Sequence, residues 1–188
     1  METIVLTLEP ALHLTDEGFY TLCLQNRDLK LELSAAGELI IMSPVGGESG
    51  IQEADLIIEL GNWNRQTGLG FVFSSSTLFR LPNGAFRSPD AAWVSRERWE
   101  SLTPEQRRRF PPLTPDFVIE LRSATDRLQL LQHKMQEYLA SGLRLGWLID
   151  PENQQVEIYR SGHPTERLDM PVTLDGEEVL PGFGLDLG

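Results

Sequence analysis

Two carboxylates at the ends of strand-like runs are the residues of this sequence best placed to do chemistry. Asp90 directly precedes an apolar run, and Glu120 interrupts the apolar run 117–121. Burying a carboxylate is costly unless a cation or a hydrogen-bond donor meets it, so Glu120 needs a partner. Either the strand ends there and Glu120 pairs with Arg122 or Arg127, or the side chain has a functional role.

Several other reaction classes lack the residues that they need. The glycine-rich stretch 44–48 has no lysine with which to bind phosphate and carries an acid instead. Cys23, the one cysteine, falls in an apolar helical segment, where a structural role is expected. The three histidines show no metal-ligand spacing. These features argue against a phosphate-loop enzyme, a cysteine nucleophile and a zinc site.

The order of the expected elements predicts an α/β fold in which helices flank a mixed β-sheet. Regular βαβ alternation, as in a doubly wound nucleotide-binding fold, is absent, and an extra N-terminal helix and hairpin precede the rest. The apolar patterns predict helices at 15–26, 49–67 and 125–141, a short helix starting at 103, hairpins at 29–42 and 145–159, and strands at 71–73, 78–81, 91–94 and 117–121.

Length and composition predict a single domain over residues 1–188. A chain of 188 residues with 40% hydrophobic side chains can bury a sizeable core. No apolar run approaches the roughly 18 residues of a membrane span, and the N-terminal residues do not form a signal peptide. One cysteine cannot form a disulfide framework. We therefore expect a cytoplasmic protein with no membrane segment.

The net charge of −12 argues on its face against a nucleic-acid partner, because binding to the phosphate backbone relies on Lys and Arg. The charge is uneven along the chain. Residues 1–86 hold four basic and eleven acidic side chains (−7), residues 87–144 hold ten and eight (+2), and residues 145–188 hold two and nine (−7). The middle third, which includes three consecutive arginines at 107–109, therefore keeps a nucleic-acid partner open.

Six segments, taken in order, resemble a known family. They read MSPVGGE at 42–48, SPDAAW at 88–93, PDFVIELRS at 115–123, KMQEY at 134–138, LGWLIDP at 145–151 and VEIYR at 156–160. This pattern resembles the "putative restriction endonuclease" domain family, abundant in cyanobacteria, of the PD-(D/E)xK nuclease superfamily. The likeness spans nearly the whole chain and implies a restriction-endonuclease-like core.

The resemblance implies a catalytic centre that uses Mg²⁺ or Mn²⁺, because hydrolysis of a phosphodiester needs a cation to neutralise charge and generate hydroxide. It assigns Asp90 to the motif aspartate, Glu120 to its acidic partner and the carbonyl of Leu121 to the backbone ligand. Glu48 matches a position where the family carries an acid or a histidine, and it completes the expected metal ligands. Oxygen donors of this kind are those that Mg²⁺ prefers.

A second Pro-Asp pair offers Asp116 as an alternative motif aspartate. Asp116 and Glu120 are four residues apart on one strand, hence about 13 Å apart at about 3.3 Å per residue, which is too far to share a metal ion. Asp90 lies on a different strand that can pair beside Glu120. We therefore favour Asp90 and expect Asp116 to mark the start of the strand.

The slot of the motif lysine holds Arg122, and an arginine cannot be deprotonated to act as a base. The chain has two lysines, Lys30 and Lys134. The resemblance points to Lys134, on the adjoining helix, as a displaced catalytic lysine that acts on the attacking water. Arg122 then becomes a predicted contact to phosphate.

Taken together, we expect a Mg²⁺- or Mn²⁺-dependent endonuclease that hydrolyses phosphodiester bonds in DNA. A homodimer is expected because cutting both strands favours two symmetric sites. Since a bound metal ion would reverse the local charge, DNA binding without metal should be weak. The alternative is a non-catalytic regulatory or protein-binding module on the same scaffold. Arg122 at the position of the motif lysine and the acidic net charge are consistent with this alternative. A small-molecule hydrolase with paired carboxylates has no supporting motif.

Overall fold

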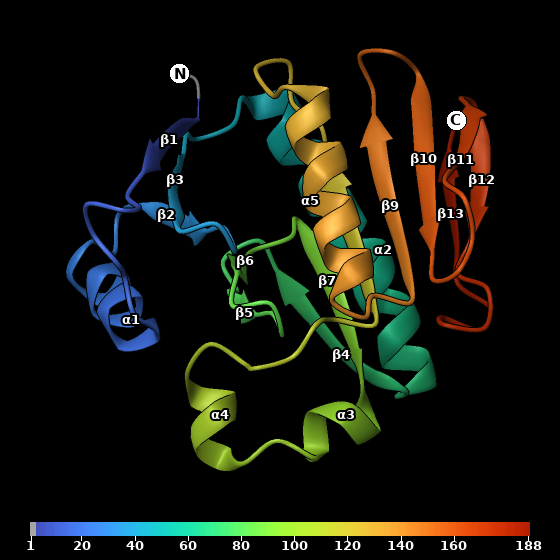
Figure 1. Ribbon diagram of the computed structural model, residues 1–188. Helices are drawn as coiled ribbons and strands as arrows, with labels where there is room; N and C mark the ends of the chain where they lie inside the picture. Colours follow the sequence, from blue (N-terminus) through green and yellow to red (C-terminus); the bar gives the residue numbers. More distant parts are fainter. Residues whose placement is uncertain (1–2) are drawn as a thin grey trace.

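A six-stranded mixed sheet forms the centre of the protein in the computed structural model, which describes residues 3–188 (Figure 1). In spatial order its strands are β11 (Glu166–Asp169), β10 (Gln155–Arg160), β9 (Leu145–Asp150), β8 (Phe117–Leu121), β7 (Ala91–Ser95) and β4 (Gly70–Ser74). Strands β8 and β9 pair in parallel, and each other neighbouring pair is antiparallel. Every residue of β8 and β9 is buried, as expected of strands covered on both faces.

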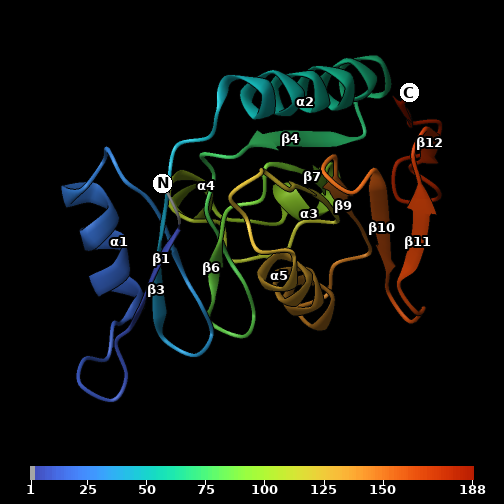
Figure 2. The same ribbon diagram turned by 90° about the horizontal axis from the view of Figure 1, so that it is seen from above.

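Two helices cover the opposite faces of this sheet, as Figure 2 shows from above. Helix α2 (Gly47–Thr67) packs on one face and α5 (Leu128–Ala140) on the other. Side chains alternate along β8, so Phe117, Ile119 and Leu121 join the core under α2, while Val118 joins the core under α5. The same alternation directs Glu120 toward α5, which connects β8 to β9 along the chain.

A second sheet of five short strands lies beside the first and comes mostly from the N-terminal region (Figure 1). Helix α1 (Asp16–Gln25) packs on it through Phe19, which meets Leu31, Leu33 and Phe86. The hairpin expected at 29–42 is present. In spatial order the strands are β1 (Ile4–Thr7), β3 (Glu38–Met42), β2 (Lys30–Leu33), β6 (Phe86–Arg87) and β5 (Phe79–Arg80).

The remaining elements lie at the periphery. They are α3 (Arg96–Glu100), α4 (Pro104–Arg108) and the antiparallel pair β12 (Val172–Asp175) and β13 (Gly184–Leu187). Within residues 3–188, no helix combines the length and the apolar character needed to cross a bilayer. The predicted α/β order is confirmed.

Helix α5 begins at Leu128, three residues later than the sequence pattern predicts. The reason is a local turn, in which the carboxylate of Asp126 accepts hydrogen bonds from the amide and the hydroxyl of Ser123. An aspartate that bonds to nearby backbone in this way competes with helix formation. Helix α2, in contrast, begins two residues earlier than predicted, at Gly47.

Two glycines on neighbouring elements test how tightly α2 and the central sheet are built. A Cβ atom at Gly70 would lie 2.2 Å from the carbonyl oxygen of Val94, whereas one at Gly61, inside α2, would have no neighbour within 4 Å. Gly70→Ala should lower the free energy of unfolding by about 1–3 kcal/mol because the backbone must move. Gly61→Ala should raise it by about 0.5–1 kcal/mol through helix propensity. Urea denaturation measures both, and a neutral Gly70→Ala would contradict this packing.

Candidate active site

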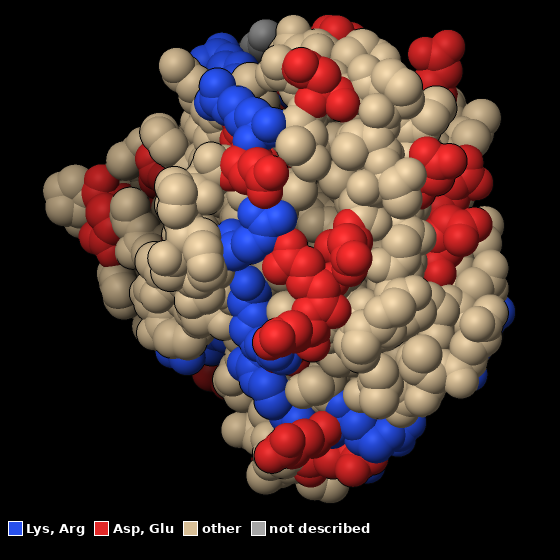
Figure 3. Space-filling model, turned by 90° about the vertical axis from the view of Figure 1, so that its right-hand side faces the viewer, with Lys and Arg blue, Asp and Glu red and all other residues tan. Residues whose placement is uncertain are grey.

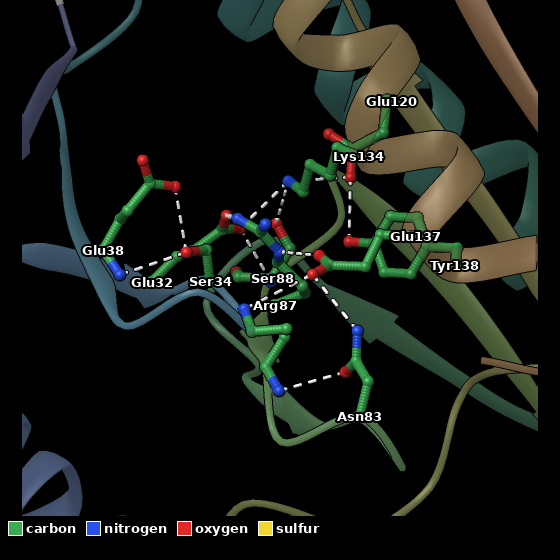
Figure 4. A network of polar contacts seen from close by, with 12 residues as sticks. Glu32, Ser34, Glu38, Asn83, Arg87, Ser88, Glu120, Lys134, Glu137 and Tyr138 are labelled. Atoms are coloured by element: carbon green, nitrogen blue, oxygen red, sulfur yellow. Dashed lines mark hydrogen bonds and ion pairs between the residues drawn. The ribbon is translucent and has the colours of Figure 1, made fainter. Parts of the chain in front are cut away.

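A buried lysine joins the two sheets beneath α5. The ammonium Nζ of Lys134 lies 2.8 Å from Oε1 of Glu120 and 2.9 Å from Oε1 of Glu32, and it donates to the carbonyl oxygen of Ser88 at 3.3 Å (Figure 4). An ammonium group carries three N–H donors. These three acceptors therefore engage every donor that Lys134 has.

Each partner arrives at this point because of the local structure of its own element. Glu120 points toward α5 through the alternation of β8, and Glu32 comes from β2 of the second sheet. Lys134 and Tyr138 are four residues apart, so they share the buried face of α5. The hydroxyl of Tyr138 donates to Oε1 of Glu120 at 3.0 Å. Glu120 is thus held from two positions on one helix.

Arg87 extends the network away from Lys134. Its guanidinium lies 3.0 Å from Oε2 of Glu32 and also bonds to Glu137 of α5 (Figure 4). The amide of Ser88 donates to Oε1 of Glu32 at 2.8 Å, and Asn83 donates to Glu137 at 3.2 Å. Glu32 is therefore satisfied on both of its oxygens.

Burial and neighbouring charges set the protonation of these groups. Burial raises the pKa of Glu120 to about 7, and Asp90 and Glu32 add to the rise while Lys134 opposes it. Burial alone would raise the pKa of Glu32, but Lys134 and Arg87 outweigh burial and lower it. Burial alone would lower the pKa of Lys134, but the carboxylates of Glu120, Glu32 and Asp90 raise it. The surrounding carboxylates therefore keep the Lys134 side chain protonated.

Asp90 lies beside Glu120 at the ends of adjacent strands. The pairing of Ala91 with Ile119 sets Asp90 opposite Glu120. Oδ2 of Asp90 accepts a hydrogen bond of 2.8 Å from the amide of Leu121. Burial raises the pKa of Asp90, and the strongest opposing charge is Lys30, whose Nζ lies 3.8 Å from Oδ1. The structure thus brings Asp90, Glu120 and Lys134 together, and it adds Lys30.

An acid of α2, Glu53, also acts on Asp90, while Glu48, the ligand expected from the sequence, lies in the first turn of the same helix. Glu53 is half-buried, and its charge helps to raise the pKa of Asp90. Glu48 is exposed in the first turn of α2. Within residues 3–188, no hydrogen bond or ion pair joins Glu48 to Asp90. The sequence indicates that Glu53 lies near the buried face of α2, because Glu53 comes about one helical turn before the buried Leu56.

Arg122 and Asp116 have other partners. Nη1 of Arg122 lies 3.1 and 3.0 Å from the two carboxylate oxygens of Asp150, and its Nε donates to the carbonyl oxygen of Asp126. Asp116 is buried directly before β8, where it accepts from the amide of Ser95 and pairs with Arg98 at 2.9 Å. The expectation that Asp116 marks the start of the strand is confirmed.

Two of the three arginines at 107–109 contact other residues of the chain, and the third, Arg108, is exposed. Arg109 pairs with Glu17 at 2.7 Å and lies over the ring of Tyr20. Arg107 donates to the carbonyl oxygen of Glu100. These contacts anchor the segment around α4 and leave it less free to meet a partner than the sequence alone suggests.

The charges around the acid pair leave room for a divalent cation. Five carboxyl groups face three cations, so the acids outnumber the cations, although burial raises the pKa of Glu120 to about 7. The acids are Glu32, Glu53, Asp90, Glu120 and Glu137, and the cations are Lys30, Arg87 and Lys134. Among residues 3–188, no group of three or more His, Cys, Asp or Glu side chains forms a complete metal site. Two carboxylates with water and substrate oxygens suffice for Mg²⁺, so the Asp90–Glu120 pair fits it.

An open groove lies on the α2 side of the central sheet, the side opposite the Glu120 carboxylate, and neither Asp90 nor Glu120 lines it. Its volume is ≈ 810 Å³, and its walls come from α2, the ends of β8 and β9, and the C-terminal strands. Leu121, whose amide bonds to Asp90, lines the groove together with Gln52 and Ile149. Asp55, Glu59 and Asp186 also line it, so its walls are not a phosphate-binding surface.

The two lysines should differ sharply in their effect on stability. Lys134→Met leaves Glu120 buried without its cation and leaves Glu32 with Arg87 alone, which should lower the free energy of unfolding by about 3–5 kcal/mol. Lys30→Met breaks a half-exposed pair and should cost less than about 1 kcal/mol. Urea denaturation without divalent metal compares the two variants. Similar losses for both would contradict the central place of Lys134.

The comparisons with known proteins agree with this geometry. The solved structure of a putative nuclease belonging to DUF820 from Anabaena variabilis has a TM-score of 0.69 and 20% sequence identity, over 83% of this chain and 86% of that chain. This likeness confirms the restriction-endonuclease-like α/β fold expected from the sequence.

The cryo-electron microscopy structure of the DrdV–DNA complex matches with a TM-score of 0.39 and 15% identity, over 62% of this chain and 10% of that chain. No curated protein matches the chain. The family model described as "Uma2: Putative restriction endonuclease" matches residues 16–188. The chain therefore belongs to the Uma2 family of putative restriction endonucleases.

Proposed function

We propose that this protein is a Mg²⁺-dependent endonuclease that hydrolyses phosphodiester bonds in DNA at the Asp90–Glu120 pair, with Mn²⁺ as a substitute ion. The observation that carries the proposal is the adjacency of the two acids. Asp90 accepts the amide of Leu121, the residue that follows Glu120. Two carboxylates thus meet at neighbouring strand ends, inside a cluster with excess negative charge. Membership of a family of putative restriction endonucleases supports the same activity.

The chain supplies the groups that this chemistry needs. A bound divalent ion would neutralise phosphate charge and generate hydroxide. Asp90 and Glu120 would hold the ion, and the carbonyl of Leu121 remains the predicted backbone ligand. Lys134 and Tyr138 fix the orientation of the Glu120 carboxylate.

The other predicted roles have different support. Glu53 is better placed than Glu48 to add negative charge near Asp90. Arg122 remains a predicted phosphate contact, and it would have to leave Asp150 to reach one.

The surface agrees with a substrate that approaches the acid pair rather than the C-terminal strands. Figure 3 shows that Lys and Arg on the face formed by these strands are bordered closely by Asp and Glu. Arg160 pairs with Glu166 and Glu177, and Arg167 pairs with Glu157. On this face the basic side chains form a narrow column that acidic side chains flank and interrupt, so little net positive charge meets a phosphate backbone. DNA binding should therefore depend on the metal-loaded site.

The proposal is tested by cleavage of plasmid and branched DNA with Mg²⁺ or Mn²⁺. Asp90→Asn and Glu120→Gln should lower the cleavage rate by about 100-fold or more, because each removes a metal ligand. Asp169→Asn is a matched control, since it removes one carboxylate from the exposed edge strand β11. Comparing Glu53→Gln with Glu48→Gln shows which acid of α2 takes part in catalysis. We expect Glu53→Gln to lower the cleavage rate more than Glu48→Gln does.

Two outcomes would contradict this function. Cleavage that survives Asp90→Asn and Glu120→Gln unchanged would show that another site acts. Absence of both cleavage and calorimetric Mg²⁺ binding at millimolar concentration would favour the non-catalytic module on the same scaffold.

A homodimer, in the cytoplasm, is proposed as the functional form. Strand β1 is an edge strand whose residues Ile4, Val5 and Leu6 are exposed, and an uncharged apolar edge of this kind favours pairing with another chain. The free thiol of Cys23 fits a reducing compartment. Light scattering should give the dimer mass for the wild type and the monomer mass for Val5→Lys. A wild type that stays monomeric at all concentrations would contradict the dimer.

A further inference from the structure

The cations around the acid pair differ in how many of their donors are already used. Lys134 is engaged by Glu120, Glu32 and Ser88. Arg87 is engaged by two carboxylates from two different elements. These cations are built into the protein, and any new acceptor would have to replace a buried carboxylate.

Moving Lys134 toward a substrate would be especially costly. Its ammonium would leave Glu120 buried without a cation and Glu32 with Arg87 alone, and the side chains of Lys134, Glu32 and Glu120 are at most 7% exposed. Uncompensated buried charge costs several kcal/mol. Lys134 therefore orients Glu120 and has no donor left for a phosphate or a water.

Lys30, in contrast to Lys134, is more exposed and less tightly bonded. Among residues 3–188, its side chain makes one ion pair, with Asp90 at 3.8 Å, which is longer than a hydrogen bond. Its side chain is 33% exposed, against 16% for Asp90 and 2% for Glu120. The Lys30 ammonium is thus the most exposed of these groups, and it donates no hydrogen bond to the residues that the structure describes. It is the first residue of β2, two positions before Glu32, so the anchoring of Glu32 also places Lys30.

We propose that Lys30 contacts the phosphate of the substrate at the Asp90–Glu120 pair, a contact that Lys134 is not free to make. The inference rests on the proposed nuclease function. A phosphate arriving at the acids comes from solvent and meets Lys30 first. Because an ammonium binds phosphate as a compact charge, Lys30 offsets the repulsion between the phosphate and the two carboxylates. Lys30 is therefore a substrate-binding residue that lies outside the six segments carrying the family resemblance.

The test is the salt dependence of DNA binding, measured by fluorescence anisotropy on a labelled duplex with Ca²⁺ in place of Mg²⁺. Between about 50 and 200 mM salt, losing one phosphate contact reduces the slope of log K against log salt by about 0.9. Lys30→Gln should show this reduction and bind about tenfold more weakly, and Lys30→Arg should restore the slope. Arg65→Gln is the matched control, because it removes an exposed cation at the far end of α2 and should leave the slope unchanged.

The outcomes separate this inference from the function on which it rests. A wild type that neither binds nor cleaves DNA would overturn both. If the wild type cleaves DNA and Asp90→Asn abolishes cleavage, the function stands. A Lys30→Gln variant with the wild-type slope and affinity would then overturn the role of Lys30 alone. Unchanged urea denaturation of Lys30→Gln would show that lost binding does not come from lost folding.

Discussion

The buried ammonium of Lys134 between Glu32 and Glu120 is the contact on which the rest of the structure depends. Glu32 belongs to the five-stranded sheet, Glu120 to the six-stranded sheet and Lys134 to the helix above them. One charged contact therefore sets how the two sheets meet and how the Glu120 carboxylate is oriented. Removing one partner of such a buried group is far more damaging than the net strength of the contact suggests, because the others stay buried and charged.

This arrangement divides the polar centre into a closed part and an open part. The closed part, built from Glu32, Arg87 and Lys134, has its hydrogen bonds satisfied within the chain. The open part is Asp90 with Lys30, nearer to solvent and less tightly bonded. Glu120 lies between them, and burial raises its pKa to about 7, so a cation has a strong influence on its charge near neutral pH. The residues that hold the site in place are therefore different from the residues that solvent can reach.

Local patterns in the sequence explain the elements better than they explain the contacts between them. The alternating hairpin at 29–42 and the placing of Asp90 and Glu120 on neighbouring strands follow from periodicity and strand geometry. Glu32 is not predictable in this way, because its partner Lys134 lies a hundred residues away on another layer. The rotational position of α2 leaves Glu53 half-buried and Glu48 exposed, a difference that the apolar spacing contains but a motif comparison does not use.

Anomalous diffraction from crystals soaked in Mn²⁺ locates the metal without relying on activity. We expect a peak within ligand distance of the carboxylates of Asp90 and Glu120, with Lys134 still bonded to both Glu32 and Glu120. A peak elsewhere, no peak at saturating Mn²⁺, or a Lys134 ammonium that has left Glu32 would contradict this expectation.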